Sequence, residues 1–325
     1  MEGSATHIEC TYCKSLESSE LYKTNDIYSN EYEIQRCQDC NCHFLSPFPN
    51  AELLERAYQN EYYGHGTDKF KADWIERLLD YFRGKRADRI HQLLNGQGRV
   101  LDLGCGNGRF LDFIQKRGDY EIHGVEISTA AAKRANRVPN LNLIVGRLNS
   151  GTYAEQSFDA ITLFHVLEHV EEPKETLDII DVLLQPNGIV AFSFPNISSW
   201  QAKIFKGAWF HMDAPRHLSF FSPQDFISIM ENRGYELVHE RHFNVEYNPY
   251  GTMQSILNLF TSKREVLYEY LKGDKAYLAE YSKLNLFLQG AFFKLTTPLF
   301  VLVDALESLF KKSGTVELIF KKKSS

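Results

Sequence analysis

The sequence predicts an α/β fold built around a parallel sheet. Between residue 99 and about residue 195, short apolar runs alternate with helical patterns, which is typical of strands connected by covering helices. A glycine-rich stretch follows the first apolar run directly, and a helical pattern follows the glycines. The chain has 325 residues, 43% hydrophobic and 24% charged, so it can bury a large core without disulfides. The runs expected as strands are 99–103, 121–126, 141–145, 158–163 and 189–194.

The first 50 residues are predicted to form a separate small unit. Five of the six cysteines lie there, and four of them form two C-x-x-C pairs, Cys10 with Cys13 and Cys37 with Cys40. Each pair can present two thiolates to one tetrahedral zinc ion. We therefore expect a closed structural zinc ribbon, with four buried or free thiols as the alternative.

The first residues of the sequence indicate the cellular compartment in which this unit is expected. The first ten residues have neither a basic nor an apolar segment, so we expect no signal peptide and a cytoplasmic setting. In a reducing compartment, clustered cysteines bind metal more often than they form disulfides. Cys42 and His43 follow the second pair and are expected to be non-ligating.

The glycine turn at residues 104–108 has the features of a nucleotide-binding loop. Glycines let the backbone approach a ligand closely, and the start of the next helix offers free amides. The second expected strand ends at Glu126, about 20 positions after Gly106, where an acid can hold the two hydroxyls of a ribose. The turn lacks the G-x-G-x-x-G spacing that a pyrophosphate needs, which argues against a dinucleotide-dependent oxidoreductase.

Residues from about 70 to 243 resemble the class I S-adenosylmethionine-dependent methyltransferases. The resemblance is carried by residues 100–108, Glu126, the segments 157–161 and 167–170, and residues 184–189. It implies a three-layer sandwich with a Rossmann-like, seven-stranded sheet, and S-adenosylmethionine as the cofactor. It also implies that the glycine loop contacts the methionine part, Glu126 the ribose, and residues 146–149 the adenine. The cofactor-binding residues expected on this basis are Asp102, Gly104, Cys105, Gly106, Asn107, Glu126, Ile127, Asn149 and Phe164.

A histidine-rich segment follows the fourth expected strand. On a helix, His165, Glu168 and His169 would share one face, because positions i, i+3 and i+4 do so. The segment matches an inverted zinc-peptidase motif, but the methyltransferase pattern around it argues against a peptidase. We expect His169 to be the general base, assisted by Glu168, with His165 and His217 as contributors. A divalent metal at this segment and a purely structural role for His169 remain open.

A second polar segment, residues 209–217, follows the fifth strand. It contains Trp209, His211, Asp213, Arg216 and His217. Such residues can bind a polar ring or a phosphate. They can equally order a loop through hydrogen bonds, with Arg216 paired to an acid elsewhere, and both interpretations remain open.

The combination of a zinc ribbon and this methyltransferase pattern resembles two subgroups with different substrates. One modifies sugars and polysaccharides, and the other methylates ribosomal RNA bases. The formal net charge of -6 disfavours nucleic acid, so we expect a small-molecule or glycan substrate, namely a sugar, glycan or cell-envelope precursor. A non-catalytic module that keeps the cofactor fold is a further alternative, which the intact glycine loop disfavours.

Residues 244–313 are expected to be a helical insertion. The sixth and seventh strands, 234–238 and 314–320, should pair side by side, with the last one antiparallel. The predicted domains are therefore the ribbon 1–50, the methyltransferase domain 51–243 plus 314–325, and the insertion 244–313.

The insertion contains a strongly apolar run from Leu284 to Phe310. Lys294 and Asp304 interrupt this run, so we expect no transmembrane segment. Three interpretations remain, namely a cover over the acceptor cleft, a homodimer interface, or an interfacial helix on the inner face of the membrane. The lysines that slightly favour anionic lipid are Lys311, Lys312 and Lys321–Lys323.

Overall fold

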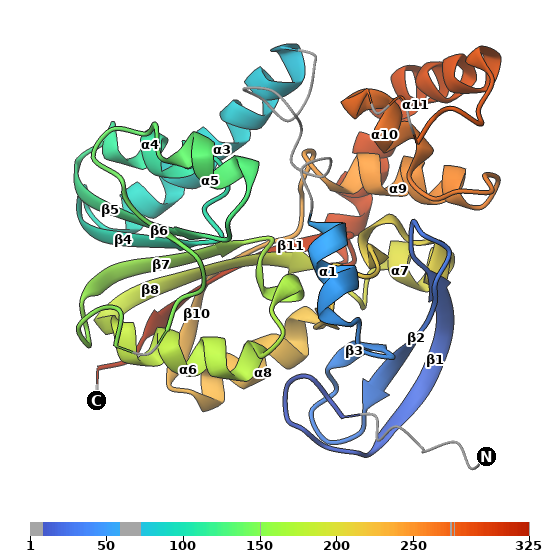
Figure 1. Cartoon of the computed structure of the whole chain (residues 1–325). Helices are drawn as coiled ribbons and strands as arrows, with labels where there is room; N and C mark the ends of the chain where they lie inside the picture. The colour runs from blue at the N-terminus through green and yellow to red at the C-terminus, as the bar shows by residue number, and fades with distance from the viewer. Residues whose placement is uncertain (1–8, 59–72, 150, 274, 276, 325) are drawn as a thin grey trace.

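A seven-stranded mixed sheet forms the centre of the protein (Figure 1). The computed structural model describes residues 9–58, 73–149, 151–273, 275 and 277–324. The strand order is β10-β11-β8-β7-β4-β5-β6, and β11 is antiparallel to both neighbours. All five strands expected between residues 99 and 195 are present, so the predicted parallel core is confirmed. The strands are β4 (Gln97–Leu103), β5 (Asp119–Glu126), β6 (Asn142–Val145), β7 (Phe158–Phe164), β8 (Leu184–Pro195), β10 (Tyr235–Arg241) and β11 (Thr315–Lys322).

Helices cover both faces of this sheet, which gives the three layers that the resemblance implies (Figure 1). The helices are α3 (Asp73–Leu93), α4 (Arg109–Gln115) and α5 (Ala130–Ala135) on one face, and α6 (Pro173–Leu183) and α8 (Pro223–Asn232) on the other. The central strands are buried on both sides, as the adjacent residues Val100 and Leu101 illustrate, because both are 0% exposed and they belong to different core clusters. Ser222 caps α8 and accepts a hydrogen bond from the Asp225 amide at 3.1 Å.

The last two strands lie as expected. β10 pairs with β11 in antiparallel register, with Tyr235 opposite Lys322, and β11 then pairs with β8. The chain therefore leaves the sheet after β10 and returns to it as β11. Everything between them is an insertion into the methyltransferase topology.

The N-terminal unit is joined to the methyltransferase part by a shared sheet. Its strands are β1 (Ser18–Asn25), β2 (Glu31–Cys37) and β3 (His43–Ser46), with β9 (Ser219–Phe220) at the edge and α1 (Ala51–Ala57) after β3. The two-residue strand β9 comes from the segment after β8, and it pairs with β3. The Leu45 amide also donates to the Leu218 carbonyl at 3.1 Å. The ribbon thus packs directly against the segment that carries His217.

The insertion is helical and forms its own layer at one end of the sheet (Figure 1). It consists of α9 (Asn248–Asn258), α10 (Val266–Lys272) and α11 (Lys283–Leu309), and α7 (Trp200–Phe205) lies near it. The apolar run forms one continuous helix, as expected, and Lys294 and Asp304 lie within it. It is the one helix in the described part of the chain that is long and apolar enough to cross a membrane. The mean hydropathy of its most apolar window is 1.6, and 6% of that window is buried.

Candidate active site

The glycine loop connects β4 to α4 at the carboxyl edge of the sheet. Gly104, Gly106 and Gly108 all have positive φ values, 67°, 57° and 72°. A Cβ atom on Gly104 would lie 2.5 Å from Cγ2 of Val166, so this position needs glycine for packing. A Cβ atom on Gly106 would meet nothing within 4 Å in the described part of the chain. The loop therefore packs closely against the protein on one side and is open at Gly106, where a ligand can approach the backbone.

Glu126 ends β5 and holds the glycine loop from the neighbouring strand. One carboxylate oxygen accepts the Gly106 amide at 2.7 Å, and the other accepts the Ile127 amide at 3.1 Å. Burial raises the pKa of Glu126, while the two amides favour its charged form. A carboxylate has about four acceptor positions, so about two remain for the hydroxyls of a ribose. This geometry fits the role that the resemblance implies for Glu126.

The other expected cofactor residues lie around the same edge, with different accessibility. Asp102 is buried and accepts the Thr162 hydroxyl at 2.6 Å, and burial raises its pKa to about 7. The Cys105 side chain is directed into the core, because a Cβ on Gly124 would lie 2.8 Å from its sulfur. Only the backbone of Cys105 is therefore suited to contact a ligand in the cleft.

The remaining members of the cofactor set complete this edge. Asn107 accepts the Arg109 amide at 3.3 Å, which shapes the end of the loop. Phe164 ends β7 and packs edge-on against Phe110, with ring centroids 5.1 Å apart. Ile127 and Asn149 are exposed after β5 and β6. The set thus lies after β4, β5, β6 and β7, where α/β sheets bind nucleotides.

The segment after β7 is a tight turn and not the helix that the spacing suggested. His165 has a φ of 57°, and residues Leu167–His169 form a single 3₁₀ turn. His165 and Glu168 still meet, with Nδ1 of the imidazole 3.2 Å from a carboxylate oxygen. The expected convergence is therefore confirmed, although the left-handed residue and the 3₁₀ turn produce it.

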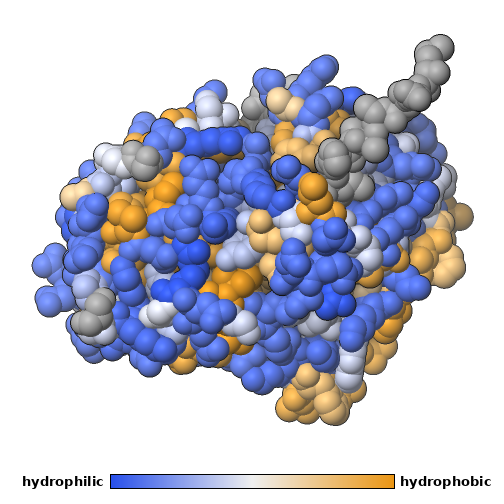
Figure 2. Space-filling view, turned by 90° about the horizontal axis from the view of Figure 1, so that it is seen from below, coloured by the Kyte–Doolittle hydropathy of each residue, from blue (hydrophilic) through white to orange (hydrophobic). Residues whose placement is uncertain are grey.

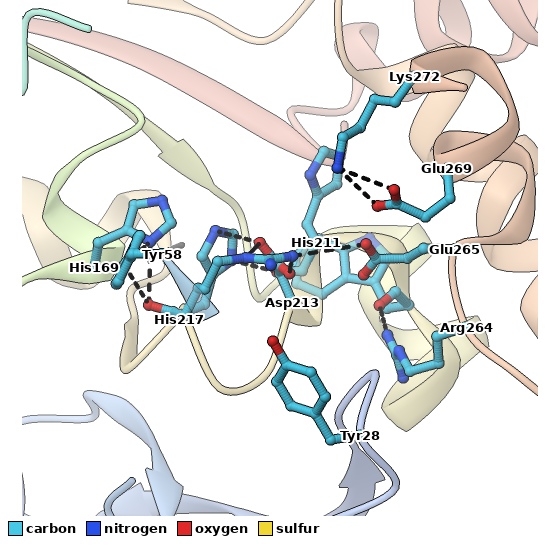
Figure 3. A network of polar contacts seen from close by, with 12 residues as sticks. Tyr28, Tyr58, His169, His211, Asp213, His217, Arg264, Glu265, Glu269 and Lys272 are labelled. Atoms are coloured by element: carbon cyan, nitrogen blue, oxygen red, sulfur yellow. Dashed lines mark hydrogen bonds and ion pairs between the residues drawn. The ribbon is translucent and has the colours of Figure 1, made fainter. Parts of the chain in front are cut away.

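His169 and His217 lie beside Glu168. The hydrogen bonds of the two imidazoles, which are labelled in Figure 3, indicate which ring nitrogens carry hydrogen. Nδ1 of His169 is 3.1 Å from the Arg216 carbonyl and 3.0 Å from the Tyr58 hydroxyl. Nδ1 of His217 is 2.8 Å from the His211 carbonyl. A carbonyl oxygen can only accept, so both Nδ1 atoms donate and both Nε2 atoms keep a lone pair.

The cluster of Glu168, His169 and His217 is rich in acceptors. One ligand atom from each residue lies within 4.8 Å of the others. Burial is the largest effect on both imidazoles, lowering the pKa of His169 to about 4 and also lowering that of His217. Burial raises the pKa of Glu168, and its Oε2 has no hydrogen-bond partner among the described residues. Such a cluster can take a proton from a bound hydroxyl, and the same three atoms could also hold a divalent cation.

The segment 209–217 is a hydrogen-bonded loop, as one of the two interpretations predicted. Nε of Arg216 donates to the Asp213 carboxylate at 3.0 Å, and Nη2 of Arg216 lies 3.7 Å from a carboxylate oxygen of Glu265. Asp213 in turn lies 3.7 Å from Nε2 of His217. Burial is the largest effect on Asp213 and opposes its ionisation, but the charges of Arg216, His217 and His169 and the hydrogen bond from Arg216 together lower its pKa. Arg216 is thus paired inside the protein with Asp213 and Glu265.

Sequence reasoning missed the residues that the insertion and α1 bring to this site. Glu265 precedes α10, Tyr247 precedes α9, and Tyr58 follows α1. The Tyr247 ring lies 4.2 Å from that of His165, and a Cβ on Gly251 would lie 2.6 Å from Nε2 of His211. These residues lie outside the segments that carry the family motifs, and no spacing rule connects them to His165 or His217.

The four paired cysteines converge in the ribbon. Sγ atoms of Cys10 and Cys40 are 3.6 Å apart, and those of Cys13 and Cys37 are 3.4 Å apart. All four sulfurs lie within 4.8 Å of one another. Zinc–sulfur bonds of about 2.3 Å in a tetrahedron require sulfurs about 3.8 Å apart, so the cluster has the dimensions of a zinc site. The Cys42 thiol is buried and lies 3.9 Å from the Thr11 hydroxyl.

Comparison with known proteins agrees with this geometry. A protein-family profile described as a methyltransferase domain matches residues 63–240. A ubiquinone biosynthesis O-methyltransferase of Histophilus somni (strain 2336) is 32% identical over 123 residues, which are 34% of this chain and 51% of that protein. One from Azoarcus sp. (strain BH72) is 28% identical over 203 residues, covering 57% of this chain and 77% of that protein.

Solved structures share the fold at low sequence identity. The [4+2]-cyclase SpnF aligns with a TM-score of 0.50 and 14% identity, covering 84% of this chain and 91% of that chain. This likeness concerns the fold alone. The matched part of the Histophilus protein is about half of its length.

Proposed function

Because this chain belongs to the class I S-adenosylmethionine-dependent methyltransferases, we propose that it transfers a methyl group from S-adenosylmethionine to a hydroxyl group of a small-molecule acceptor. S-adenosylmethionine supplies an electrophilic methyl group, and the acceptor oxygen must lose a proton as the new bond forms. The observation that carries the proposal is the acceptor-rich cluster of Glu168, His169 and His217, directly after β7. The relatives named as O-methyltransferases support a hydroxyl acceptor.

In this proposal His169 receives the acceptor proton on Nε2. Its Nδ1 hydrogen is held by the Arg216 carbonyl, which fixes the tautomer and the orientation of the ring. The Glu168 carboxylate beside it stabilises the positive charge that the ring acquires. The His211 carbonyl orients His217 through its Nδ1, Asp213 lies 3.7 Å from its Nε2, and His165 keeps Glu168 in place. Alignment of the acceptor oxygen with the methyl group supplies much of the remaining acceleration.

The insertion forms the acceptor side of the site in this proposal. Tyr247 contacts the His165 ring, and Gly251 approaches His211, so the start of α9 covers these two histidines. Asp304 of α11 holds the segment before α9 in place, because its carboxylate accepts a hydrogen bond from the Asn244 backbone amide at 2.9 Å. An acceptor would therefore bind between the cofactor edge of the sheet and the start of α9.

Two acceptor classes are proposed, in order. A hydroxylated aromatic ring comes first, because Tyr247 and His165 offer flat surfaces and the relatives are named for ubiquinone biosynthesis. A sugar, glycan or cell-envelope precursor comes second. The ring nitrogens Nε2 of His165 and His211 and Oε2 of Glu168 are buried without a partner in the described part of the chain, and a polyhydroxy compound could pair with them. The sugar acceptor has no counterpart among the relatives named above.

Methyl transfer to a panel of acceptors tests this proposal. The full chain is incubated with methyl-labelled S-adenosylmethionine and a catechol, a nucleotide sugar or ribosomal RNA. Transfer to catechol supports the first acceptor class, and transfer to the nucleotide sugar supports the second. Transfer to RNA alone, or no binding of S-adenosylmethionine, would refute the proposal.

A variant of the insertion tests the acceptor side separately. Tyr247→Ala should raise KM for the acceptor about tenfold or more while the Kd for S-adenosylmethionine stays within about twofold. The matched control is Tyr81→Ala, because Tyr81 is an exposed tyrosine on α3. Equal kinetics for both variants would mean that α9 does not contact the acceptor.

We also propose that Cys10, Cys13, Cys37 and Cys40 hold one structural zinc ion. The support is the spacing of the four sulfurs, which matches a tetrahedral site. Zinc would crosslink the turn before β1 to the turn after β2, and so stabilise the sheet that contacts β9. Thiolate ligands fit a reducing compartment, and we propose that the protein is cytoplasmic.

A further inference from the structure

The outer face of α11 is a continuous apolar stripe. Counting 3.6 residues per turn, its exposed leucines fall within an arc of about 80°. Leu295 and Leu309 are each 80% exposed, so the stripe is in contact with solvent and not with the domain. The leucines of the stripe are Leu284, Leu288, Leu295, Leu299, Leu302, Leu306 and Leu309.

Further apolar side chains extend this surface at the start of the helix. Phe260 is 82% and Leu259 is 57% exposed at the end of α9. The Lys263 amide donates to the Tyr281 hydroxyl at 3.0 Å, so this turn lies beside the start of α11. Figure 2 shows that hydrophobic side chains gather in patches on an otherwise largely hydrophilic surface. An exposed apolar area of this extent is typical of a surface that binds another protein or a membrane.

The inner face of α11 is polar and is bound to the protein. Asp304 accepts the Asn248 side-chain amide at 2.7 Å, and Glu307 accepts that of Gln201 at 2.8 Å. Placing a helix with these two acids across a bilayer would break both contacts. It would also bring acidic side chains into the hydrocarbon region, where they are costly unless they are paired. The helix is therefore suited to lie along an apolar surface with its inner face still on the domain.

The charges of α11 indicate the kind of surface. All residues of α11 are described, and its exposed charged side chains are Lys283 and Lys294, whereas its two acids are buried. Both lysines lie along one flank of the stripe at 3.6 residues per turn. There they can place their ammonium groups beside anionic headgroups while the leucines enter the acyl region.

A second copy of the chain fits this surface less well. In antiparallel pairing of two α11 helices the same flank of each helix would meet, and Lys294 would lie near Lys294 of the other copy, because it is close to the centre of Lys283–Leu309. No exposed acid on α11, all of whose residues are described, is available to offset this repulsion.

Two of the lysines singled out from the sequence make contacts within the domain. Lys311 is paired with Glu240, and Lys322 donates to the Asp181 and Leu184 carbonyls at 2.6 and 2.9 Å. The C-terminus lies at the opposite end of the sheet from the start of α11 (Figure 1). On α11 itself, the attraction to an anionic surface therefore depends on Lys283 and Lys294.

We propose that α11 docks the protein on the surface of an anionic lipid bilayer, lying in the interface without crossing it. The leucine stripe makes the apolar contact with the bilayer, and the two lysines are attracted to the anionic headgroups. The buried acids hold the helix on the domain. The proposal concerns α11 alone and does not depend on which acceptor is methylated.

Vesicle flotation of the full chain tests this docking. Vesicles of phosphatidylcholine with phosphatidylglycerol should bind the protein, and pure phosphatidylcholine vesicles should bind it more weakly. Leu295→Glu combined with Leu302→Glu should lower the partition coefficient at least about tenfold. Lys283→Gln combined with Lys294→Gln should remove the preference for the anionic vesicles. The matched control is Val182→Glu on α6, an apolar site that is 48% exposed and should leave binding unchanged.

The outcomes separate the alternatives. Each variant is first shown to unfold cooperatively and to bind S-adenosylmethionine as the parent does, so a loss of vesicle binding is not a loss of fold. Absence of binding to anionic vesicles would overturn the proposal, as would equal binding by the leucine variant. A parent dimer that the leucine variant converts to a monomer, without vesicle binding by either, would overturn it in favour of a second copy on the stripe. Binding that resists salt and alkaline carbonate extraction would overturn it in favour of a spanning helix.

Discussion

Glu126 provides the sharpest test of the cofactor site. Its carboxylate accepts the Gly106 amide at 2.7 Å and the Ile127 amide at 3.1 Å, so it holds the glycine loop and faces the open side of Gly106. The substitution Glu126→Ala removes both acceptors of the loop amides. It also removes the acceptors that remain for a ribose.

The expected loss follows from the hydrogen bonds that disappear. Hydrogen bonds to a charged group contribute about 1.5–3 kcal/mol each, and water replaces part of what is lost at an accessible cleft. We expect the binding free energy of S-adenosylmethionine to weaken by roughly 1–3 kcal/mol, which is about 5- to 150-fold in Kd. Glu126→Gln keeps one acceptor oxygen and should show a smaller loss.

Isothermal titration with S-adenosylmethionine measures this loss directly. The matched control is Glu121→Ala, since Glu121 lies on the same strand, is half exposed, and pairs with Arg99 at 2.9 Å. The control should bind the cofactor as the parent does. If Glu126→Ala unfolds cooperatively and its Kd stays within about twofold of the parent, the ribose assignment is wrong.

Three further predictions concern the zinc site, the base and pH. Cys37→Ser should reduce zinc from about one ion per chain to a trace, measured by metal analysis, whereas Cys42→Ser should retain it; equal zinc in both would refute the assignment. His169→Ala should lower turnover at least about 100-fold with cofactor affinity nearly intact, and equal loss of both would favour a structural role. Burial raises the pKa of Asp102 to about 7, so the carboxyl is neutral below this pH and attracts the cationic cofactor only above it. Titrations at several pH values should therefore show that the affinity for S-adenosylmethionine rises up to about pH 7 and is constant above it, and Asp102→Asn should remove this rise.

The sequence alone was sufficient to predict the parts of the fold in which residues that are close in space also belong to consecutive elements of the chain. Each strand of a parallel sheet and the loop after it form a local unit, and those loops all meet at one edge. The glycine loop and Glu126 could therefore be placed together from their positions in the chain. The cysteine pairs are a second such case, because two tight turns with fixed spacing allow few arrangements other than a shared site.

Only the tertiary structure decided what surrounds His169 and what α11 presents to solvent. The pairing of β9 and the packing of the insertion bring together the segments that carry Tyr58, His217 and the Tyr247–His165 contact. No local sequence pattern encodes such long-range contacts. The 3₁₀ turn likewise depends on a left-handed His165, which helix periodicity does not predict. For α11, apolar residues on all sides left the inner face ambiguous. The buried contacts of Asp304 and Glu307 determine that face, and with it the leucine stripe that stays exposed.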